Sequence, residues 1–407
     1  MSPHILFVDT GKEWGGGTNS LLLLCVNLKS RGYRVGAAFF HDYIGQGQNV
    51  GEAFRQAGID FHLLPIIHRK WHKMLRELLR ALLFLNRNWR EALLARLDRL
   101  IRIEPAAKQL ATLAREHQID LLYGNNQPSS NQEVLRAGQM THLPVVLHVR
   151  KTTQLTAAER DLVNIAARRV ICVSDSVREH YLAQGLRPEL CGTIANGIDP
   201  TATHFLPPAE ARKQLALPAD DFVIGTVCSL LPLKCVDQLL EAFARLKVGA
   251  GETPRCVVIG DGPERERLEA LGKTLGIADR CRFAGFRKNA AELLQACDVF
   301  VLPSRQEGMP RSILEAMLAA RPTLAAEVAG CRDLVRHGET GFLYPHGDVD
   351  ALVDRLRQIA ADPALRQRLG QTARKIVLAE YSLRTHVGRV AEVIDKILGQ
   401  TTVAPSS

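Results

Sequence analysis

The chain of 407 residues is 46% hydrophobic and 23% charged, a balance typical of a globular protein with room for two domains. It contains no run of about 20 apolar residues that could span a membrane, and its start lacks the basic region and cleavage site of a signal peptide. Nine scattered cysteines without a Cys-x-x-Cys pair do not form the pattern of a disulfide or zinc framework. We therefore expect a cytoplasmic protein in a reducing compartment.

The formal net charge of +9 is concentrated in one segment. Residues 66–102 contain ten Lys and Arg against three acidic residues, which gives +7, and their leucines recur at helical spacing beside Trp89. Such a basic amphipathic helix could lie on an anionic membrane surface, or its leucines could face the domain core while the arginines are solvated. Nucleic acid is a third possible partner, but no aromatic or Gly-rich basic motif accompanies the charge, so we expect no nucleic-acid binding.

Apolar segments alternate with helical segments in the first half of the chain, as in a Rossmann-like parallel sheet. The expected strands are 4–9, 33–40, 59–65, 119–126, 143–149 and 169–174. After the first strand, Gly15, Gly16 and Gly17 would let the backbone approach a ligand, and Thr18 or Asn19 could cap a helix that starts at Asn19. The loop has neither the GxGxxG pattern nor the Gly-Lys-Ser/Thr ending of a P-loop.

One of these strands ends in His148-Val-Arg150-Lys151. Ligands of open α/β sheets bind at the carboxyl ends of the strands, so His148 or Arg150 could bind a sugar hydroxyl or offset the charge of a diphosphate. The competing interpretation is that both side chains are simply solvated at the strand end.

The second half of the chain repeats the alternation. A strand, a loop with Lys234 and a helix are expected over 222–246, and Lys234 is a flexible point charge that suits a phosphate. The turn Gly260-Asp-Gly262 lacks the third glycine of a dinucleotide fingerprint and is followed by proline, so we do not expect a nicotinamide cofactor. Late helices are expected at 350–361, 364–380 and 383–398.

The segment Glu307–Glu315 follows the apolar run 299–303, which is typical of a buried parallel strand, and leads into a helix over 311–320. Free N–H groups at the start of that helix would bind a phosphate. Glu315 lies about one turn inside the helix, where it could meet the sugar part of a nucleotide. Alternatively, Glu307 is a carboxylate favoured by the helix dipole and Glu315 is an ordinary helix-face residue.

The run PSRQEGMPRSILEAMLAARPTLAAEVAGCRDLVRHGETGFLYPHGD resembles the donor-site signature of the retaining GT-B glycosyltransferases, in the large family 4-like, group 1 set with two glutamates separated by seven residues. The resemblance implies catalytic roles for His148, Glu307 and Lys234, with Arg150 as the other choice for the histidine place. It implies a donor-binding set: Gly16, Gly17, Arg150, Ser229, Lys234, Gly260, Gly262, Arg282, Gly308, Met309, Pro310, Arg311, Ser312 and Glu315. It also implies an acceptor side at Gly15, Asn126 and Asn196, and no metal.

The chain departs from the family pattern beside Lys234. Cys228-Ser229-Leu230 stands where the family often has Gly-Arg-Leu, and Cys235 replaces the usual glycine. One cation for the donor phosphates is therefore absent, and a hydrogen bond from Ser229 would be weaker than a charge-assisted one.

We expect an α/β protein of the GT-B class, with two Rossmann-like domains facing across a cleft. Residues 1–200 would form the acceptor domain, 201–383 the donor domain, 384–400 a helix that crosses back to the first domain, and 401–407 a loose tail. No cofactor is expected beyond the donor substrate, a UDP-sugar first and a GDP-sugar second.

The expected reaction is transfer of a hexosyl unit to a glycolipid or saccharide acceptor in cell-envelope polysaccharide or lipopolysaccharide synthesis. The basic segment would place the protein at the inner membrane face. Two alternatives stay open: a sugar-nucleotide epimerase or hydrolase on the same scaffold, and an inactive membrane-associated partner.

Overall fold

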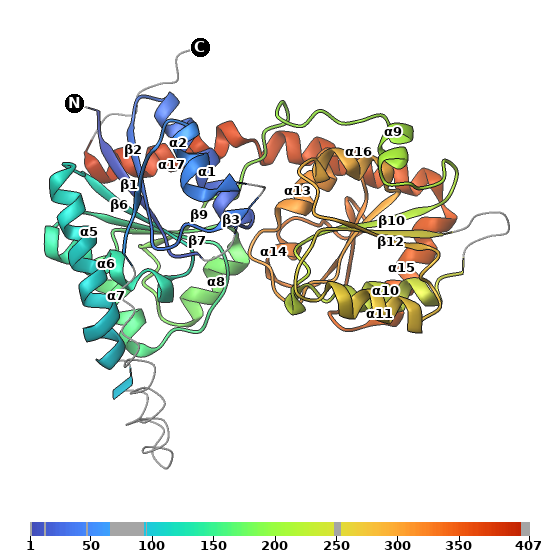
Figure 1. Ribbon diagram of the computed structural model, residues 1–407, viewed down its shortest axis with the longest axis horizontal. Helices are drawn as coiled ribbons and strands as arrows, with labels where there is room; N and C mark the ends of the chain where they lie inside the picture. The colour runs from blue at the N-terminus through green and yellow to red at the C-terminus, as the bar shows by residue number, and fades with distance from the viewer. Residues whose placement is uncertain are drawn as a thin grey trace. The chain divides into compact units, whose positions relative to one another are not determined.

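The computed structural model describes residues 2–11, 14–45, 48–65, 93–94, 96–247 and 254–399, which form two α/β units (Figure 1). Unit 1 comprises the described residues within Met1–Cys172, Arg178–Thr193 and Arg389–Ser407. Unit 2 comprises those within Val173–Val177 and Ile194–Gly388. Two helices, α8 (Asp175–Ala183) and α17 (Leu383–Leu398), contribute residues to both units.

Unit 1 is an alternation of strands and helices. In chain order its elements are β1 (His4–Asp9), α1 (Gly16–Ser30), β2 (Arg34–Phe39), β3 (Ile44–Gly45), β4 (Gln48–Asn49), α2 (Val50–Gln56), β5 (Asp60–Leu63), a π-helical turn (Arg99–Ile103), α5 (Glu104–Glu116), β6 (Leu121–Asn125), a 3-10 turn (Pro128–Ser130), α6 (Gln132–Thr141), β7 (Val145–Val149), α7 (Ala157–Ala166), β8 (Arg169–Cys172) and β9 (Cys191–Thr193).

Unit 2 repeats this organisation. Its elements are α9 (Pro208–Gln214), β10 (Val223–Val227), a 3-10 turn (Pro232–Lys234), α10 (Val236–Arg245), β11 (Arg255–Ile259), α11 (Arg265–Thr274), β12 (Cys281–Gly285), α12 (Ala290–Leu293), a 3-10 turn (Leu294–Ala296), β13 (Val299–Leu302), α13 (Arg311–Leu318), β14 (Thr323–Ala326), α14 (Ala329–Arg332), β15 (Gly341–Tyr344), α15 (Val349–Ala361) and α16 (Pro363–Glu380).

Each unit is built on one parallel sheet. The order is β5-β2-β1-β6-β7-β8-β9 in unit 1 and β12-β11-β10-β13-β14-β15 in unit 2. In both sheets the chain first builds outward on one side of the first strand and then returns to the other side, so the order reverses beside β1 and beside β10. These reversals are the switch points at which doubly wound sheets bind ligands.

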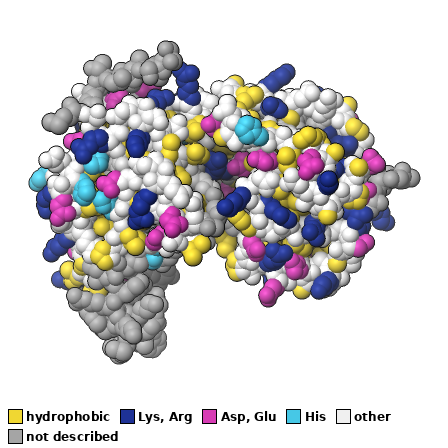
Figure 2. All heavy atoms as spheres, turned by 45° about the horizontal axis from the view of Figure 1, so that its top comes forward, with side chains coloured by type: hydrophobic (Ala, Val, Ile, Leu, Met, Phe, Trp, Pro, Cys, Tyr) yellow, Lys and Arg dark blue, Asp and Glu magenta, His cyan; other side chains and the backbone are white. Residues whose placement is uncertain are grey.

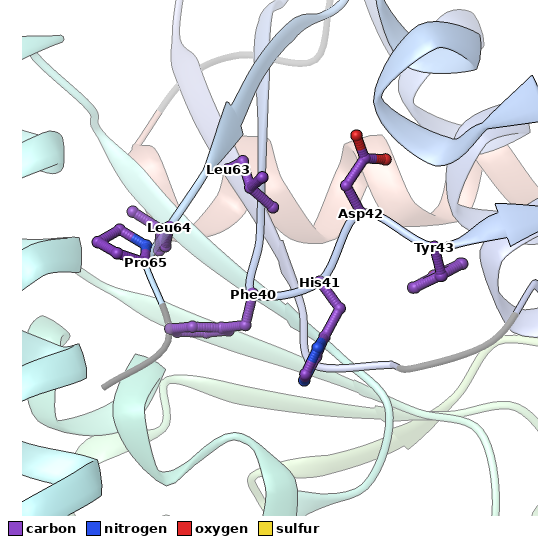
Figure 3. Close-up of a pocket in the computed structure, with 7 residues that line it drawn as sticks. All are labelled: Phe40, His41, Asp42, Tyr43, Leu63, Leu64 and Pro65. Atoms are coloured by element: carbon purple, nitrogen blue, oxygen red, sulfur yellow. The ribbon is translucent and has the colours of Figure 1, made fainter. Parts of the chain in front are cut away.

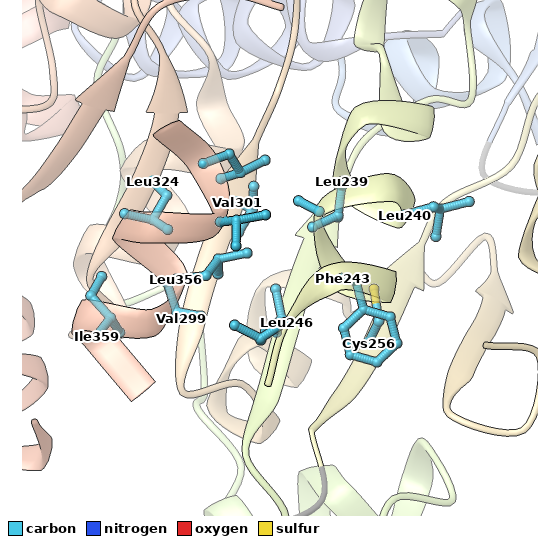
Figure 4. Close-up of a cluster of buried hydrophobic side chains, with 14 of the residues drawn as sticks. Leu239, Leu240, Phe243, Leu246, Cys256, Val299, Val301, Leu324, Leu356 and Ile359 are labelled. Carbon is cyan, nitrogen blue, oxygen red and sulfur yellow. The ribbon is translucent and has the colours of Figure 1, made fainter. Parts of the chain in front are cut away.

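Helices cover both faces of the unit 2 sheet, because successive strand residues point to opposite sides. Figure 4 shows Leu239 and Phe243 of α10 and Leu356 of α15 packed with Val299 and Val301 of β13 on one face. The other face carries a smaller cluster made by α9, α12 and alternate residues of β10 and β11. The two-sided burial explains why the strands are continuous apolar runs in the sequence.

The expected α/β fold class is confirmed, and the strands predicted in the first half all form within two residues of their expected ends. The predicted start of α1 is wrong: the helix begins at Gly16, so Thr18 and Asn19 lie inside it, and Gly15 is the residue before it. Sequence reasoning did not identify β9 or the β3–β4 hairpin.

Most of the basic segment 66–102 lies outside the described residues, as does the predicted tail 401–407. At its described end, Leu93 is 41% and Leu100 is 59% exposed, while Arg102 pairs with the buried Glu133. Among the helices that the structure describes, none has both the length and the apolar character required to cross a bilayer.

Candidate functional site

Two loops of unit 2 meet where the strand order reverses. The loop after β10 carries Lys234, and the loop after β13 carries Glu307. Lys234 Nζ donates to Glu307 Oε1 at 2.6 Å, and only 19% and 9% of the two side chains are exposed. Burial lowers the pKa of Lys234, but the charge and hydrogen bond of Glu307 act against it, and the pKa lies above its usual value. The fold thus holds a charged ammonium group at a ligand-binding position.

The start of α13 adds a second electropositive element to this loop. Pro310 precedes the helix, and no side chain caps its first turn. The amide of Ile313 donates to the Pro310 carbonyl oxygen at 3.2 Å, so the N–H groups of Arg311 and Ser312 and the positive end of the helix dipole can act on an anion. Ser312 lies in the same turn.

Glu315 lies one turn further along α13 and pairs with Arg311 at 3.6 Å, and 19% of each side chain is exposed. Burial raises the pKa of the Glu315 carboxyl, and the charge and hydrogen bond of Arg311 offset only part of this effect. A buried carboxyl group whose ionised form is disfavoured is typical of functional positions.

Glycines hold the surrounding loops in backbone contact. Gly260 has a φ of +144°, and a Cβ there would overlap the carbonyl oxygen of Cys228; at Gly262 (φ +157°) it would lie 2.6 Å from the carbonyl oxygen of Leu230. The amide of Leu230 donates to the backbone carbonyl oxygen of Asp261 at 2.8 Å. These contacts fix the loop that presents the exposed Ser229, so the two glycines shape the site.

The loop after β13 also packs on α14 and on a segment near the start of unit 2. A Cβ at Gly330 would overlap the carbonyl group of Gly308. The amide of Asn196 donates to Met309 Sδ at 3.0 Å, and its side chain donates to the Met309 carbonyl oxygen at 3.4 Å. Asn196, which was expected on the acceptor side, therefore lies buried against the predicted donor loop, and Met309 is itself only 6% exposed.

The edge of the unit 2 sheet offers a cation and an aromatic ring. Arg282 is exposed on the edge strand β12, and Phe286, directly after that strand, is 54% exposed. The amide of Gly260 donates to Gly285 at 2.9 Å, which ties the end of β12 to the loop after β11. An exposed ring and a guanidinium group can both stack on a nucleobase.

Unit 1 has a polar cavity of about 290 Å³ at its own switch point, between the loops after β1 and β6. Its lining residues are Asp9, Thr10, Gly11, Gly15, Gly17, Thr18, Asn126, Gln127, Ser130 and Lys151. Asp9 is buried and accepts hydrogen bonds from the side chains of Asn125 and Asn126 at 2.6 and 2.7 Å. Burial raises the pKa of Asp9, and these hydrogen bonds and the charge of Arg150 partly reverse that shift.

Arg150 contacts residues at this cavity, whereas His148 lies within β7. Arg150 follows β7, donates to Asn125 Oδ1 at 2.6 Å, and would lie 3.4 Å from a Cβ at Gly17. His148 is fully buried inside β7 and shares a 2.8 Å hydrogen bond with the Tyr123 hydroxyl. His148 lies one residue before the end of β7, and its predicted catalytic role stays a prediction.

A second cavity of about 550 Å³ lies at the carboxyl ends of β2 and β5 in unit 1. Figure 3 shows Phe40, Leu64 and Pro65 grouped at one end of it and Tyr43 at the other. The Tyr43 hydroxyl lies 3.0 Å from Thr18 Oγ1, which lines the polar cavity. A polar and a partly apolar cavity therefore adjoin at Tyr43.

Residues 208–376 match the family of glycosyl transferases group 1, and residues 15–197 match the glycosyl transferase 4-like domain. The two matches cover most of unit 2 and unit 1, including the Lys234–Glu307 site. The chain belongs to the group 1 glycosyl transferases.

Relatives with this glycosyl transferase architecture include EpsD of Bacillus subtilis, 33% identical over 57% of this chain and 62% of EpsD. The lipopolysaccharide core biosynthesis glycosyltransferase LpsD of Rhizobium meliloti is 31% identical over 46% of this chain and 54% of LpsD. The matched region thus spans roughly half to under two thirds of these relatives. The crystal structure of Anabaena HepE in complex with UDP and glucose shares the GT-B fold at a TM-score of 0.78 and 24% identity, and covers 97% of this chain and all of HepE.

Several residues at the unit 1 cavities were not identified from the sequence. Asp9, Asn125, Tyr43 and Lys151 all line or support the unit 1 cavities. A polar residue that directly ends an apolar strand, such as Asp9 or Asn125, is the signal that could have found two of them. Within the described residues, the loops that carry Lys234 and Glu307 hold no group of side chains with metal-ligand spacing.

Proposed function

We propose that this chain transfers a hexosyl unit from a nucleotide-sugar to a saccharide or glycolipid acceptor, with retention of anomeric configuration. The observation that carries the proposal is the buried Lys234–Glu307 pair beside the uncapped start of α13, at the switch point of the unit 2 sheet. A UDP-sugar is the first choice of donor and a GDP-sugar the second; UDP and glucose are the ligands named for HepE.

In the proposed reaction, the donor diphosphate binds between Lys234 and the first turn of α13. The leaving diphosphate gains negative charge as the glycosidic bond breaks, and a fixed ammonium with oriented N–H groups stabilises that charge without reorganisation. Glu307 already holds the Lys234 side chain in one position, so little of the freedom of Lys234 is lost when the donor binds. Lys234 thus acts on the leaving group.

The two glutamates would then bind hydroxyl groups on either side of the diphosphate. Glu307 would accept from hydroxyls of the transferred sugar, and Glu315, one helical turn deeper, from the ribose. Arg311 holds Glu315 in place, and its buried Nη1 atom has no hydrogen-bond partner among the described residues, so it could donate to the nucleotide. Ser229 would supply a neutral hydrogen bond where relatives of this class often have an arginine.

The acceptor is proposed to bind in unit 1. Asp9, Asn126 and Lys151 give the smaller cavity the polar side chains that bind sugar hydroxyls. The adjoining cavity exposes apolar surface, with Leu63 51% exposed, as a lipid-linked acceptor would require. Leu93 and Leu100, at the described end of the basic segment, are also exposed.

A donor-binding experiment tests the proposal. Thermal unfolding of the full chain is followed with UDP, GDP and ADP, since a ligand that binds only the folded state raises the melting temperature. One nucleotide should stabilise the wild type but not Lys234→Ala or Glu315→Gln. Lys288→Ala and Glu266→Gln, which remove a charge at exposed positions of unit 2, are the matched controls.

Product analysis separates the remaining alternatives. Transfer from a UDP-sugar to a lipid-linked saccharide, lost in Glu307→Gln, supports the proposal. Release of free sugar or an altered sugar nucleotide without any acceptor indicates a hydrolase or an epimerase. If neither the wild type nor any variant binds a nucleotide, the proposed donor site is overturned. The protein would then be an inactive partner, and Ser229 in place of the arginine would be the residue that indicates it.

Membrane attachment has its own test. The full chain is sedimented with vesicles of neutral lipid and with vesicles that contain anionic lipid. Co-sedimentation only with anionic vesicles, reduced when Arg76, Arg80, Arg87 and Arg90 are changed to Glu, supports a membrane-bound acceptor. Equal behaviour with both vesicles contradicts this part of the proposal.

A further inference from the structure

Three potential metal ligands from two distant parts of the sequence come together in unit 1. Asp60, His62 and His117 each offer one ligand atom, and these atoms all lie within 4.8 Å of one another. His62 Nε2 is 3.2 Å and His117 Nδ1 is 3.7 Å from Asp60 Oδ2. Ligands about 2.0–2.1 Å from a tetrahedral zinc ion are about 3.4 Å apart, close to both distances. We propose that these three side chains bind a divalent transition-metal ion, with Zn²⁺ as the best match.

The strand β5 presents two of the ligands on one side. Asp60 and His62 are separated by one residue and therefore point to the same face, while Phe61 between them points into the core and is 8% exposed. Phe61 packs on Phe39 with ring centroids 5.3 Å apart, and Asp60 pairs in register with Gly36 of β2. The core thus fixes the position of the backbone that carries both ligands.

The third ligand is fixed by the turn between α5 and β6. His117 directly follows α5, and its amide donates to Leu113 at 3.0 Å. The carbonyl oxygen of His117 accepts a 2.9 Å hydrogen bond from Nδ1 of the buried His4, whose own amide donates to Asp120 Oδ2 at 2.7 Å. The supporting contacts hold the ligand-bearing backbone before any ion binds.

The ligand types decide which ion fits. Two imidazoles with one carboxylate suit Zn²⁺ and other late first-row ions, whereas Mg²⁺ and Ca²⁺ prefer oxygen ligands alone. Asp60 is 55%, His117 37% and His62 18% exposed, so water can supply the fourth ligand and the ion can enter from solvent. An ion pair between Asp60 and His62 alone would be a weak surface interaction and would not require His117.

His117 lies at the amino end of β1, whereas the polar cavity lies at its carboxyl end. β1 begins at His4 beside His117 and ends at Asp9 in the cavity lining, a separation of about 16 Å at about 3.3 Å per residue. The ion would therefore tie the edge strand β5 to the turn before β6 and stabilise unit 1. None of its three ligands lines the polar cavity, and the inference does not depend on the proposed transfer reaction.

Cobalt binding tests the site directly. Full-length protein without an affinity tag is freed of metal by a chelator and titrated with Co²⁺, whose visible absorption bands report tetrahedral coordination. Stoichiometric binding, with displacement of Co²⁺ by Zn²⁺, is expected. Each of His62→Ala, His117→Ala and Asp60→Asn should weaken binding at least about tenfold, whereas His204→Ala, at an exposed position of unit 2, should not.

A stability measurement supplies the second readout. Zn²⁺ should raise the melting temperature of the wild type progressively with its concentration and leave that of the two histidine variants unchanged. Circular dichroism at a temperature below the transition shows that the variants are folded. The proposal is overturned if the wild type shows no tetrahedral cobalt spectrum, or if the His62 and His117 variants bind Co²⁺ as tightly as the His204 control.

Discussion

Lys234 and Glu307 form an ion pair in the ligand-free structure, and both are assigned to the donor in the proposed reaction. Their burial makes the pair sensitive to removal of one partner, because the other charge is then left uncompensated. Lys234→Met should lower the free energy of unfolding by about 3 kcal/mol, and adding Glu307→Gln should restore most of it. Urea unfolding measures both values.

The double variant also separates stability from function. Lys234→Met with Glu307→Gln should be folded and nearly as stable as the wild type, yet without transfer activity, because the charge at the leaving diphosphate is gone. Activity in the double variant would show that the pair only supports the fold. Equal destabilisation of the single and double variants would contradict the ion-pair argument.

Glu315 gives a prediction about pH. Its folded-state pKa is raised, with burial as the largest cause, so the unfolded chain releases the proton first as the pH rises from about 4.5. Ionisation of Glu315 therefore favours unfolding. The resulting loss in the free energy of unfolding is absent below the pKa of Glu315 in the unfolded chain, and it grows with pH until the pH passes the pKa in the folded chain. Glu315→Gln removes the cost, so it should unfold at higher urea concentration than the wild type above pH 5.

The comparison is made by urea unfolding of both proteins between pH 4 and pH 8. The difference in the free energy of unfolding, in favour of Glu315→Gln, should widen with rising pH. The variant should also fail to bind UDP, which is the trade-off between stability and function expected of a ligand-binding residue. A gap that stays constant with pH would show that Glu315 titrates alike in both states.

At the scale of elements, the loop after β13 depends on α14. Gly330→Ala would place a Cβ against the carbonyl group of Gly308, where only backbone lies, so the loop that carries Glu307 must shift. We expect a loss of about 1–3 kcal/mol in stability and weaker UDP binding. Gly272→Ala in α11 is the matched control, because its Cβ would have no heavy atom closer than 3.9 Å and a helical Ala is favoured over Gly.

Calorimetry or urea unfolding gives the stability change, and titration with UDP gives the change in affinity. The Gly330 variant should lose both, and the Gly272 variant should keep the affinity and match or exceed the wild-type stability. If UDP affinity is unchanged in Gly330→Ala, the position of the loop does not control donor binding.

Elements with strong local patterns were predictable from the sequence, and those fixed by tertiary contacts were not. Long apolar runs such as β13 and the periodic helices α15 to α17 form close to where they were expected. The start of α1 was misplaced because three glycines have low helix propensity, yet Gly16 and Gly17 are helical here. The three residues of β9 carry too little pattern to indicate a strand without β8 beside them.

The residues of the candidate site also differ in how far the sequence predicted them. Glu307 and Glu315 share one loop and helix, so their spacing allowed a joint site, and the resemblance to a family favoured it and added Arg311. The pairing of Lys234 with Glu307 joins residues 73 positions apart and was not predicted, although the resemblance to a family assigned both residues to the donor. The burial of His148 could not be read from the sequence, because one residue decides whether a side chain lies inside a strand or beyond its end.

At the scale of the whole molecule, the net charge of +9 is concentrated in the segment 66–102, where it amounts to +7. Figure 2 shows basic and acidic side chains interspersed on the face in view. This distribution fits binding of small charged ligands at defined loops better than a broad electrostatic surface for nucleic acid.

The helix α17 contributes to both units, and its last turns complete the core of unit 1. Val390, Ala391 and Ile394 are at most 3% exposed, and Asp395 accepts a 2.6 Å hydrogen bond from the Tyr33 hydroxyl. Ending the chain after Gly388 would remove this apolar surface and leave the Tyr33 hydroxyl without Asp395. The loss is about 4 kcal/mol from the buried Val and Ile side chains, a large part of the stability of one domain.

Calorimetry of the truncated chain with and without UDP tests this assignment. Unit 1 should unfold in a separate transition at lower temperature, while the transition of unit 2, which holds Lys234 and Glu307, should still shift upward with UDP. A chain ended after Gly399 is the matched control, because it keeps all of α17. If both chains unfold at the same temperature, the end of α17 adds nothing to unit 1; if truncation also abolishes the UDP shift, the donor site needs more than unit 2 to fold.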